Sequence, residues 1–226
     1  MRTALLRELP GLETGKIDTL SAFGTALLNK NQVMDLTAIT DPEGVARLHF
    51  LDSLTLLDAI PFAGRSVVDV GCGAGFPGVP LKIVEPSIQL TLLDSLRKRM
   101  DWLTEVLPTL GVEAECVTAR AEEFAGEYRE CFDIAVSRAV ARLNVLLELC
   151  LPLVRVGGRF LAMKGANAGT ELAEAGRALD VLGGRVCETR VYPVGDAQHR
   201  VIVVEKFAAT PVQYPRRFTK IKQKPL

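Results

Sequence analysis

The chain has 226 residues, 48% of them apolar, and its 27 Lys and Arg residues are balanced by 27 Asp and Glu residues. This length and apolar content predict one large domain and exclude wholesale disorder, and the balanced net charge gives no sign of an acidic partner. Five scattered cysteines without a C-x-x-C pair indicate buried thiols in a reducing cytoplasm, not a disulfide framework or a metal site. We find no signal-peptide pattern and no apolar run of the roughly 20 residues that a membrane helix needs. We therefore expect a cytoplasmic protein without membrane contact or bound metal.

The first 60 residues predict a helical extension packed on the core. Residues 14–29 have amphipathic spacing, which is typical of a helix. Asp41-Pro42-Glu43 predicts the start of a second helix, running to about residue 59, because it combines a capping Asp with a proline at the first helical position. Helical spacing places His49, Asp52 and Ser53 on one face of this helix. They either fix the helix against its neighbour or serve the function, and the spacing does not decide between these roles.

A glycine-rich loop follows the first predicted strand. Residues 66–70 form a short, β-branched, nearly uncharged run, as expected for a strand buried on both faces. Gly71, Gly73 and Gly75 come next, and glycines let the chain turn sharply and let a ligand lie against bare backbone. Loops at the carboxyl ends of parallel strands are where open α/β sheets bind nucleotides. The stretch therefore predicts a nucleotide-type site, the alternative being a turn without a ligand.

The residues around this loop favour one class of nucleotide. Gly73 to Gly78 satisfies G-x-G-x-x-G, which alone is weak evidence for a dinucleotide. Asp69 at the mouth of the loop would oppose a pyrophosphate, and Pro77 removes an amide donor. S-adenosylmethionine carries positive sulfonium and amino groups and no phosphate, so it fits these residues better.

A second acid and a cluster of cations follow the next strand. Asp94 ends the predicted strand 88–94 and lies 19 residues past Gly75, close to the ~20-residue spacing at which a carboxylate reaches ribose hydroxyls. A helix cap shared with Ser95 is the alternative role. The next helix, 95–107, opens with Arg97, Lys98 and Arg99, although cations there oppose the helix dipole. They either form a solvated surface or contact phosphates.

The rest of the chain alternates strands and helices. Residues 119–124 suit the lining of an adenine pocket, and the strand 131–136 delivers Ser137-Arg138-Ala139 to the same sheet edge. The other expected elements are strands at 113–118, 159–163, 185–192 and 200–206, helices at 143–153 and 170–182, and a hairpin-like connection at 193–196. This order predicts an α/β fold with a doubly wound, seven-stranded, mostly parallel sheet whose last strand is antiparallel.

The C-terminal residues are basic and contain no acid. Arg216, Arg217, Lys220, Lys222 and Lys224 are interleaved with prolines and aromatic residues. They form either a disordered solubilising tail or an arm that binds phosphates and becomes ordered on RNA. The expected organisation is thus an extension (1–60), a core (61–208) and a basic tail (209–226).

With these residues in place, the chain resembles the 16S ribosomal RNA guanine-N7 methyltransferases, also called the glucose-inhibited division protein B family. The resembling residues are 36–39, 49–53, 69–81, 91–99, 121–124, 137–139 and 164–165. The most family-specific are Phe76-Pro77-Gly78 and Asp94-Ser95-Leu96-x-Lys98-Arg99. Asp35, Leu48 and Gln198-His199-Arg200 depart from the family pattern on the side expected to face the substrate.

The resemblance implies a Rossmann-like class I methyltransferase that modifies N7 of one guanine in 16S ribosomal RNA. Separately, we expect the RNA to be modified within the small ribosomal subunit and the protein to act as a monomer; the sequence leaves open whether naked RNA or an assembled particle is the substrate. It implies S-adenosylmethionine contacts at Gly71, Phe76, Asp94, Ser95, Leu96, Ala121, Glu122 and Arg138, to which the glycine pattern adds Gly73 and Gly75. Our candidates for RNA contacts are Arg97, Lys98, Arg99, Lys164, Arg216, Arg217 and Lys220. Guanine N7 has a free lone pair, so we assign no general base and give Arg138 a positioning role.

Three other functions stay open on the sequence alone. A methyltransferase acting on a small molecule or a protein would use the same cofactor loop. An NAD-dependent oxidoreductase could use Gly73-x-Gly75-x-x-Gly78, and a non-catalytic RNA-binding module would need only the cations. Titration with S-adenosylmethionine and with NAD separates the two cofactor classes.

Overall fold

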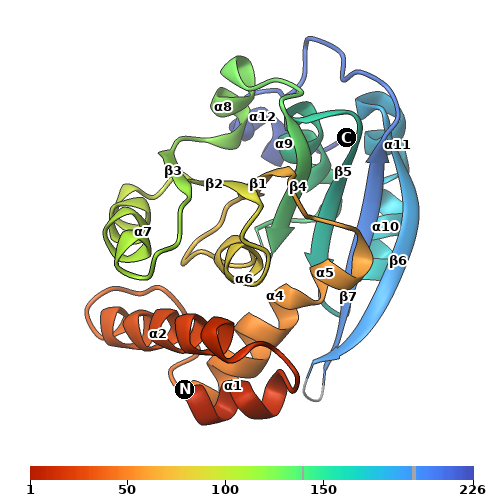
Figure 1. The fold of residues 1–226 in the computed structure, drawn as a ribbon. Helices are drawn as coiled ribbons and strands as arrows, with labels where there is room; N and C mark the ends of the chain where they lie inside the picture. The colour runs from red at the N-terminus through yellow and green to blue at the C-terminus, as the bar shows by residue number, and fades with distance from the viewer. Residues whose placement is uncertain (139, 195–196) are drawn as a thin grey trace.

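The computed structural model describes residues 1–138, 140–194 and 197–226 and contains one seven-stranded sheet of order β3-β2-β1-β4-β5-β7-β6 (Figure 1). The strands are β1 (Ser66–Val70), β2 (Gln89–Asp94), β3 (Glu115–Thr118), β4 (Phe132–Arg138), β5 (Val154–Lys164), β6 (Gly184–Val194) and β7 (Ala197–Lys206). β7 is antiparallel to both of its neighbours, and the pairs among β1 to β5 are parallel. The predicted fold class is therefore confirmed, including the antiparallel last strand.

Helices cover both faces of this sheet (Figure 1). One face packs against the N-terminal helices, α6 and α7, and the other against α8, α9, α11 and α12. The helical elements are α1 (Arg2–Glu8), α2 (Thr14–Asn31), α3 (Pro42–Gly44), a π-helix (Val45–Leu51), α4 (Asp52–Leu54), α5 (Leu56–Ala59), α6 (Gly78–Val84), α7 (Arg97–Thr109), α8 (Ala121–Glu127), α9 (Leu143–Cys150), a 3₁₀ turn (Leu151–Leu153), α10 (Ala168–Glu174), α11 (Gly176–Leu182) and α12 (Phe218–Gln223).

The period-two alternation of strand side chains divides the core into these two layers. In β4, Ile134 and Val136 belong to the layer under α6 and α7, whereas Ala135 belongs to the layer under α9. β1 alternates in the same way, with Val67 on the first side and Val68 on the second. Both faces are buried, which is why these strands are nearly continuous apolar runs.

The N-terminal extension is bound to the core through aromatic rings. Phe23 of α2 lies with its ring centroid 5.6 Å from that of Phe76 and 5.9 Å from that of Trp102. Phe50 contacts Phe76 edge-on at 5.5 Å. The extension therefore supports the residue that follows the glycine loop. The single helix predicted from residue 42 is wrong in detail, because residues 45–51 are π-helical, a feature that often marks functional sites.

Several predicted boundaries also need correction. β5 begins at Val154 instead of residue 159, and the predicted helix 170–182 is divided at Ala175 into α10 and α11. β6 continues through Pro193 and Val194, so only residues 195 and 196 of the predicted connection remain, and they lie outside the described residues, as does Ala139.

The basic tail is ordered, so its interpretation as a disordered segment is wrong. α12 buries Ile221 completely in the core layer under α9. Arg216 donates to both carboxylate oxygens of Glu148, a fully buried residue of α9, at 2.7 and 2.5 Å. The segment therefore packs on the core of the protein through both a buried ion pair and an apolar contact.

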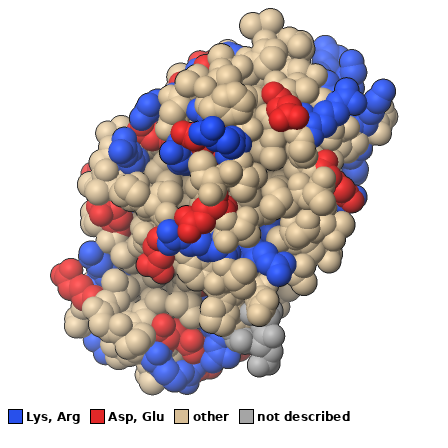
Figure 2. Space-filling model, turned by 90° about the vertical axis from the view of Figure 1, so that its right-hand side faces the viewer, with Lys and Arg blue, Asp and Glu red and all other residues tan. Residues whose placement is uncertain are grey.

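Charges are mixed on the side of the molecule that carries the outer strand β6. Figure 2 shows positive and negative side chains interspersed over this side. Two arginines of β6 are paired, Arg185 with Glu205 and Arg190 with Glu188, each at 2.6 Å. Such a surface is not suited to bind a run of phosphates. Across the described ranges, we also find no helix with the length and apolar character to cross a bilayer.

Candidate cofactor and active site

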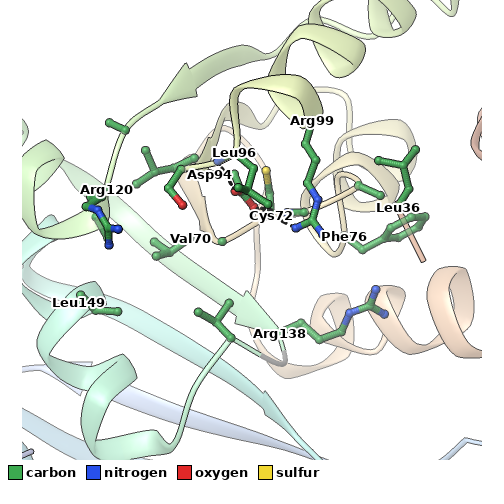
Figure 3. A pocket seen from close by; sticks show the side chains of 18 of the residues that line it. Leu36, Val70, Cys72, Phe76, Asp94, Leu96, Arg99, Arg120, Arg138 and Leu149 are labelled. Atoms are coloured by element: carbon green, nitrogen blue, oxygen red, sulfur yellow. Dashed lines mark hydrogen bonds and ion pairs between the residues drawn. The ribbon is translucent and has the colours of Figure 1, made fainter. Parts of the chain in front are cut away.

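A cavity of about 700 Å³ lies at the carboxyl ends of β1, β2 and β4 (Figure 3). Its lining includes every predicted cofactor residue except Gly75, namely Gly71, Gly73, Phe76, Asp94, Ser95, Leu96, Ala121, Glu122 and Arg138. Open α/β sheets bind their ligands at this edge, and the volume suits a nucleoside-sized ligand. The sheet topology thus brings together residues from four separate segments.

The three glycines of the loop after β1 have different structural roles. Gly71 and Gly73 have φ angles of +72° and +57°, which only glycine adopts without strain. A Cβ at Gly73 would meet only Arg99 Nη1, at 3.8 Å, so the backbone there is open to a ligand. A Cβ at Gly75 would lie 2.7 Å from Cγ2 of Val79. Gly75 therefore serves packing beneath the loop, which corrects its prediction as a cofactor contact.

Asp69 lies beneath the loop and not at its mouth, which corrects a second expectation. The residue is fully buried, and its Oδ2 accepts a hydrogen bond of 2.7 Å from the amide of Gly78. Its Oδ1 has no hydrogen-bond partner among the described residues, and burial raises its pKa to about 7. Asp69 therefore ties the amide of Gly78 to the end of β1 and fixes the start of α6 beneath the loop.

Asp94 connects the loops that follow β1 and β2. Its Oδ2 accepts from the amide of Gly73 at 3.0 Å and its Oδ1 from the amide of Leu96 at 2.8 Å. The residue is only 7% exposed, but it borders the cavity. Each carboxylate oxygen has a further lone pair. Asp94 can therefore accept hydrogen bonds from two ligand hydroxyls while it holds both loops.

Arg99, which we predicted as an RNA contact, points into the cavity (Figure 3). Its side chain is 27% exposed, compared with 85% for that of Arg97. The Nη1 atom lies 3.8 Å from Oδ2 of Asp94, and the buried Nε has no hydrogen-bond partner in the described part of the chain. Helical rotation directs Arg97 outward and Arg99 inward. The guanidinium of Arg99 thus has donors available for an anionic group of a ligand.

A second arginine, Arg138, is held at the other end of the cavity. Its Nη1 donates to the carbonyl of Leu48 at 3.0 Å and to Oδ2 of Asp52 at 3.2 Å. Its Nη2 lies 3.0 Å from Nδ1 of His49. Asp52 also contacts Nδ1 of His199 through Oδ1 at 2.8 Å. His49 and Asp52, whose role the sequence left open, therefore both orient Arg138, and His199, one of the departures from the family pattern, supports Asp52.

His49 is neutral in this network. Burial and then the charge of Arg138 lower its pKa to about 3. Arg138 can only donate, so Nδ1 of His49 accepts, and its Nε2 carries the hydrogen and donates to Thr37 Oγ1 at 2.8 Å. The imidazole also stacks on Phe76, with the ring centroids 4.6 Å apart. Both ring nitrogens are thus engaged, and His49 is not placed to remove a proton from a substrate.

The opposite end of the cavity is formed by the segment leading into α8 and by the tail. Figure 3 shows Arg120 at one end and Arg138 at the other. Ala121, Glu122 and Phe218 line the Arg120 end. Arg120 belongs to the segment 119–124 that the sequence predicts as a lining of the adenine pocket. Sequence reasoning missed Phe218, because it belongs to no pattern with a known chemistry.

Two other predicted RNA contacts occupy buried ion pairs. Lys164 is 8% exposed, pairs with Glu171 at 2.8 Å and donates to the carbonyl of Ala141. Arg216 pairs with Glu148 at 2.5 Å. Neither side chain is free to contact a phosphate, which corrects both predictions. The remaining candidates are Arg97, Lys98, Arg217 and Lys220, all exposed.

Cys72 and Cys150 are buried, but Cys131 and Cys187 are exposed, which corrects the prediction of buried thiols. In the described parts of the chain, we find no group of three or more His, Cys, Asp or Glu residues that could hold a metal ion.

Solved structures with this fold include S-adenosylmethionine-dependent methyltransferases. The chain matches an S-adenosylmethionine-dependent methyltransferase from Aquifex aeolicus with a TM-score of 0.54 and 20% identity, covering 78% of this chain and 97% of that one. It matches the T. thermophilus 16S rRNA methyltransferase RsmC, in complex with AdoMet and guanosine, with a TM-score of 0.50 and 21% identity, over 70% of this chain and 39% of that one. At these identities the likeness shows the fold, which is that of the Rossmann-like methyltransferases.

Sequence relatives define the family. The family described as rRNA small subunit methyltransferase G matches residues 16–200. Curated relatives named ribosomal RNA small subunit methyltransferase G include one from Acetivibrio thermocellus, 45% identical over 95% of this chain and 90% of its own length. Another, from Halalkalibacterium halodurans, is 46% identical over 91% of this chain and 89% of its own length. The chain belongs to the rRNA small subunit methyltransferase G family.

Proposed function

We propose that this protein transfers the methyl group of S-adenosylmethionine to N7 of a guanine in 16S ribosomal RNA. The observation that carries the proposal is the match to relatives named ribosomal RNA small subunit methyltransferase G over more than nine-tenths of the chain. The cavity supports the cofactor, because its donors and acceptors suit a ligand with a ribose, a carboxylate and no phosphate.

Four features of this cavity fit S-adenosylmethionine. The carboxylate of Asp94 would hold the two ribose hydroxyls, and the open backbone at Gly73 would lie against the methionine part. The unpartnered Nε and the guanidinium of Arg99 would bind the methionine carboxylate. Ala121 and Glu122 would face the adenine. Arg138 is a poorer candidate for the carboxylate, because its amino groups already donate to three protein acceptors.

The chemistry needs positioning more than proton transfer. The bound cofactor supplies a methyl group made electrophilic by its sulfonium, and guanine N7 offers a lone pair without losing a proton. The chain's residues therefore have to hold the guanine in line and exclude water. N7 methylation leaves a positive charge on the base, so a neutral His49 beside Phe76 is a more favourable neighbour than a second cation. Asp52 and His49 keep Arg138 in a fixed orientation at this end of the cavity.

Exposed cations would bind the RNA backbone. Arg97 and Lys98 open α7 beside Ser95 and Leu96, which line the cavity, and Arg217 and Lys220 flank Phe218 of the tail. Their contacts with phosphates would make RNA affinity fall with salt. Because the proposed acceptor is RNA of the small ribosomal subunit, we expect the protein to act in the cytoplasm. We expect it to act as a monomer.

The test uses the chemical lability of N7-methylguanine. Purified protein is incubated with labelled S-adenosylmethionine and with either small subunits or naked 16S ribosomal RNA from cells that lack the enzyme. Reduction and aniline treatment should then cut the RNA at a single guanine. Arg138→Ala should abolish the cut, whereas Arg185→Ala, on the far strand β6, should leave it unchanged. Label on a protein, on a small molecule or on a base that resists cleavage would contradict the proposal.

A further inference from the structure

The C-terminal segment, residues 209–226, supplies part of the cofactor cavity although it lies beyond the matched region 16–200. Phe218, the first residue of α12, lines the cavity beside Arg120, Ala121 and Glu122. We propose that the ring of Phe218 contacts the adenine of the bound cofactor, so that the tail is a wall of the cofactor site. This assignment rests on the proposed use of S-adenosylmethionine.

The tail is fixed on both sides of Phe218. Before it, Arg216 donates to both oxygens of the buried Glu148 at 2.7 and 2.5 Å, and its backbone amide donates to the same carboxylate at 2.9 Å. After it, Ile221 lies one helical turn further on and is fully buried. Arg129 holds the preceding residues by donating to the carbonyls of Thr210 and Tyr214 at 2.6 and 2.8 Å. The ring of Phe218 is therefore held in place and does not belong to a free arm.

Phe218 also contacts the residues expected to face the adenine. Its amide donates to Oε1 of Glu122 at 3.3 Å, and the guanidinium carbon of Arg120 lies 5.6 Å from the centroid of its ring. The second oxygen of Glu122 can accept from the exocyclic amine of adenine. The carboxylate of Glu122 in α8 would thus accept one hydrogen bond from the tail and one from the cofactor.

The position in the cavity favours adenine over an RNA base as the partner of this ring. Asp94 marks the ribose between the two ends of the cavity, and Arg138 marks the end expected to receive the guanine (Figure 3). His49, whose Nδ1 lies 3.0 Å from Nη2 of Arg138, lines the same end. The end of the cavity at Phe218 would therefore receive the adenine, because aromatic rings stack well on the flat, apolar face of a base. Arg217 and Lys220 are exposed, whereas Phe218 is half-buried.

The test compares cofactor binding by Phe218→Ala, Phe218→Tyr and the wild type, using calorimetric titration with S-adenosylmethionine and with adenosine. Phe218→Ala should raise the Kd of both ligands by about tenfold, because both contain the adenine. Phe218→Tyr keeps the ring and should bind like the wild type. Phe207→Ala is the matched control, since its ring also lies near an arginine, Arg185 at 5.9 Å, but outside the cavity.

The outcomes separate this inference from the proposed function. A wild-type protein that does not bind S-adenosylmethionine would overturn both. Normal wild-type binding, together with a Kd for Phe218→Ala within twofold of it, would overturn the adenine contact alone. If Phe218→Ala does not fold, Phe218→Leu keeps apolar bulk without a flat ring, and an unchanged adenosine Kd in that variant would likewise overturn the contact.

Discussion

Replacing Asp94 with alanine should weaken cofactor binding without unfolding the protein. The variant loses the acceptors for two ribose hydroxyls, and a hydrogen bond to a charged group is worth about 1.5 kcal/mol at the low end of its range. Two such bonds give a loss of about 3 kcal/mol, or a rise in Kd of about two orders of magnitude. The amides of Gly73 and Leu96 also lose their acceptor. They border an open cavity where water can replace it, so the cost in stability should be about 1 kcal/mol.

Calorimetric titration with S-adenosylmethionine measures the effect. The control is Asp101→Ala, which removes an acid from α7, the helix that follows Asp94. The side chain of Asp101 is 60% exposed, and its Oδ2 lies 3.9 Å from Nε of Arg97. That variant should bind like the wild type. A Kd for Asp94→Ala within threefold of the wild type, with an unchanged circular dichroism spectrum, would refute the role of Asp94.

Three further predictions concern the anchor of the tail, the RNA surface and the buried acid. Glu148→Gln removes the charge opposite Arg216 and should lower the free energy of unfolding by about 2 kcal/mol in urea denaturation, and a loss below about 0.5 kcal/mol would contradict the role of this pair. Replacing both Arg97 and Lys98 with alanine should flatten the slope of log RNA affinity against log salt by about 2, and an unchanged slope would remove them from the interface. Burial raises the pKa of Asp69 to about 7 from 3.8, so its folded state retains a proton that the unfolded state releases at lower pH. The stability of the wild type relative to Asp69→Asn should therefore be highest in acid and fall as the pH rises through about 7, and a difference independent of pH would show that this pKa is not raised.

The sequence predicted the site best where a backbone conformation requires one particular residue type. Gly71 and Gly73 do adopt positive φ angles at the end of β1, and Asp94 does border the cavity that they open. The alternation of apolar strands with amphipathic helices was enough to predict the sheet and its antiparallel last strand.

Side-chain direction was the main source of error in the site. Arg97 and Arg99 are two residues apart, yet one faces solvent and the other faces the cavity, because a helix turns about 100° per residue. Lys164 and Arg216 look like surface cations in the sequence, but tertiary contacts bury them against Glu171 and Glu148. Lysines and arginines in a sequence therefore predict positive charge but do not predict which of their side chains are exposed to solvent.

Contacts between distant segments were beyond the reach of sequence patterns. Asp52 and His199 lie 147 residues apart, and the amide of Phe218 bonds to a carboxylate 96 residues away. Neither pair belongs to a repeating pattern, so only the fold identifies Asp52 and His199 as supports of Arg138 and places Phe218 in the cofactor cavity.

The most direct measurement is a map of N7-methylguanine in 16S ribosomal RNA from cells with and without this protein. Reduction and aniline cleavage of the RNA should show one N7-methylated guanine that disappears when the gene is deleted. Wild-type protein should restore it, and Asp94→Ala, expressed to the same level, should not. Retention of every N7-methylguanine in the deletion strain, or loss of a methyl group from another atom instead, would contradict the assignment of this chain as a guanine-N7 methyltransferase.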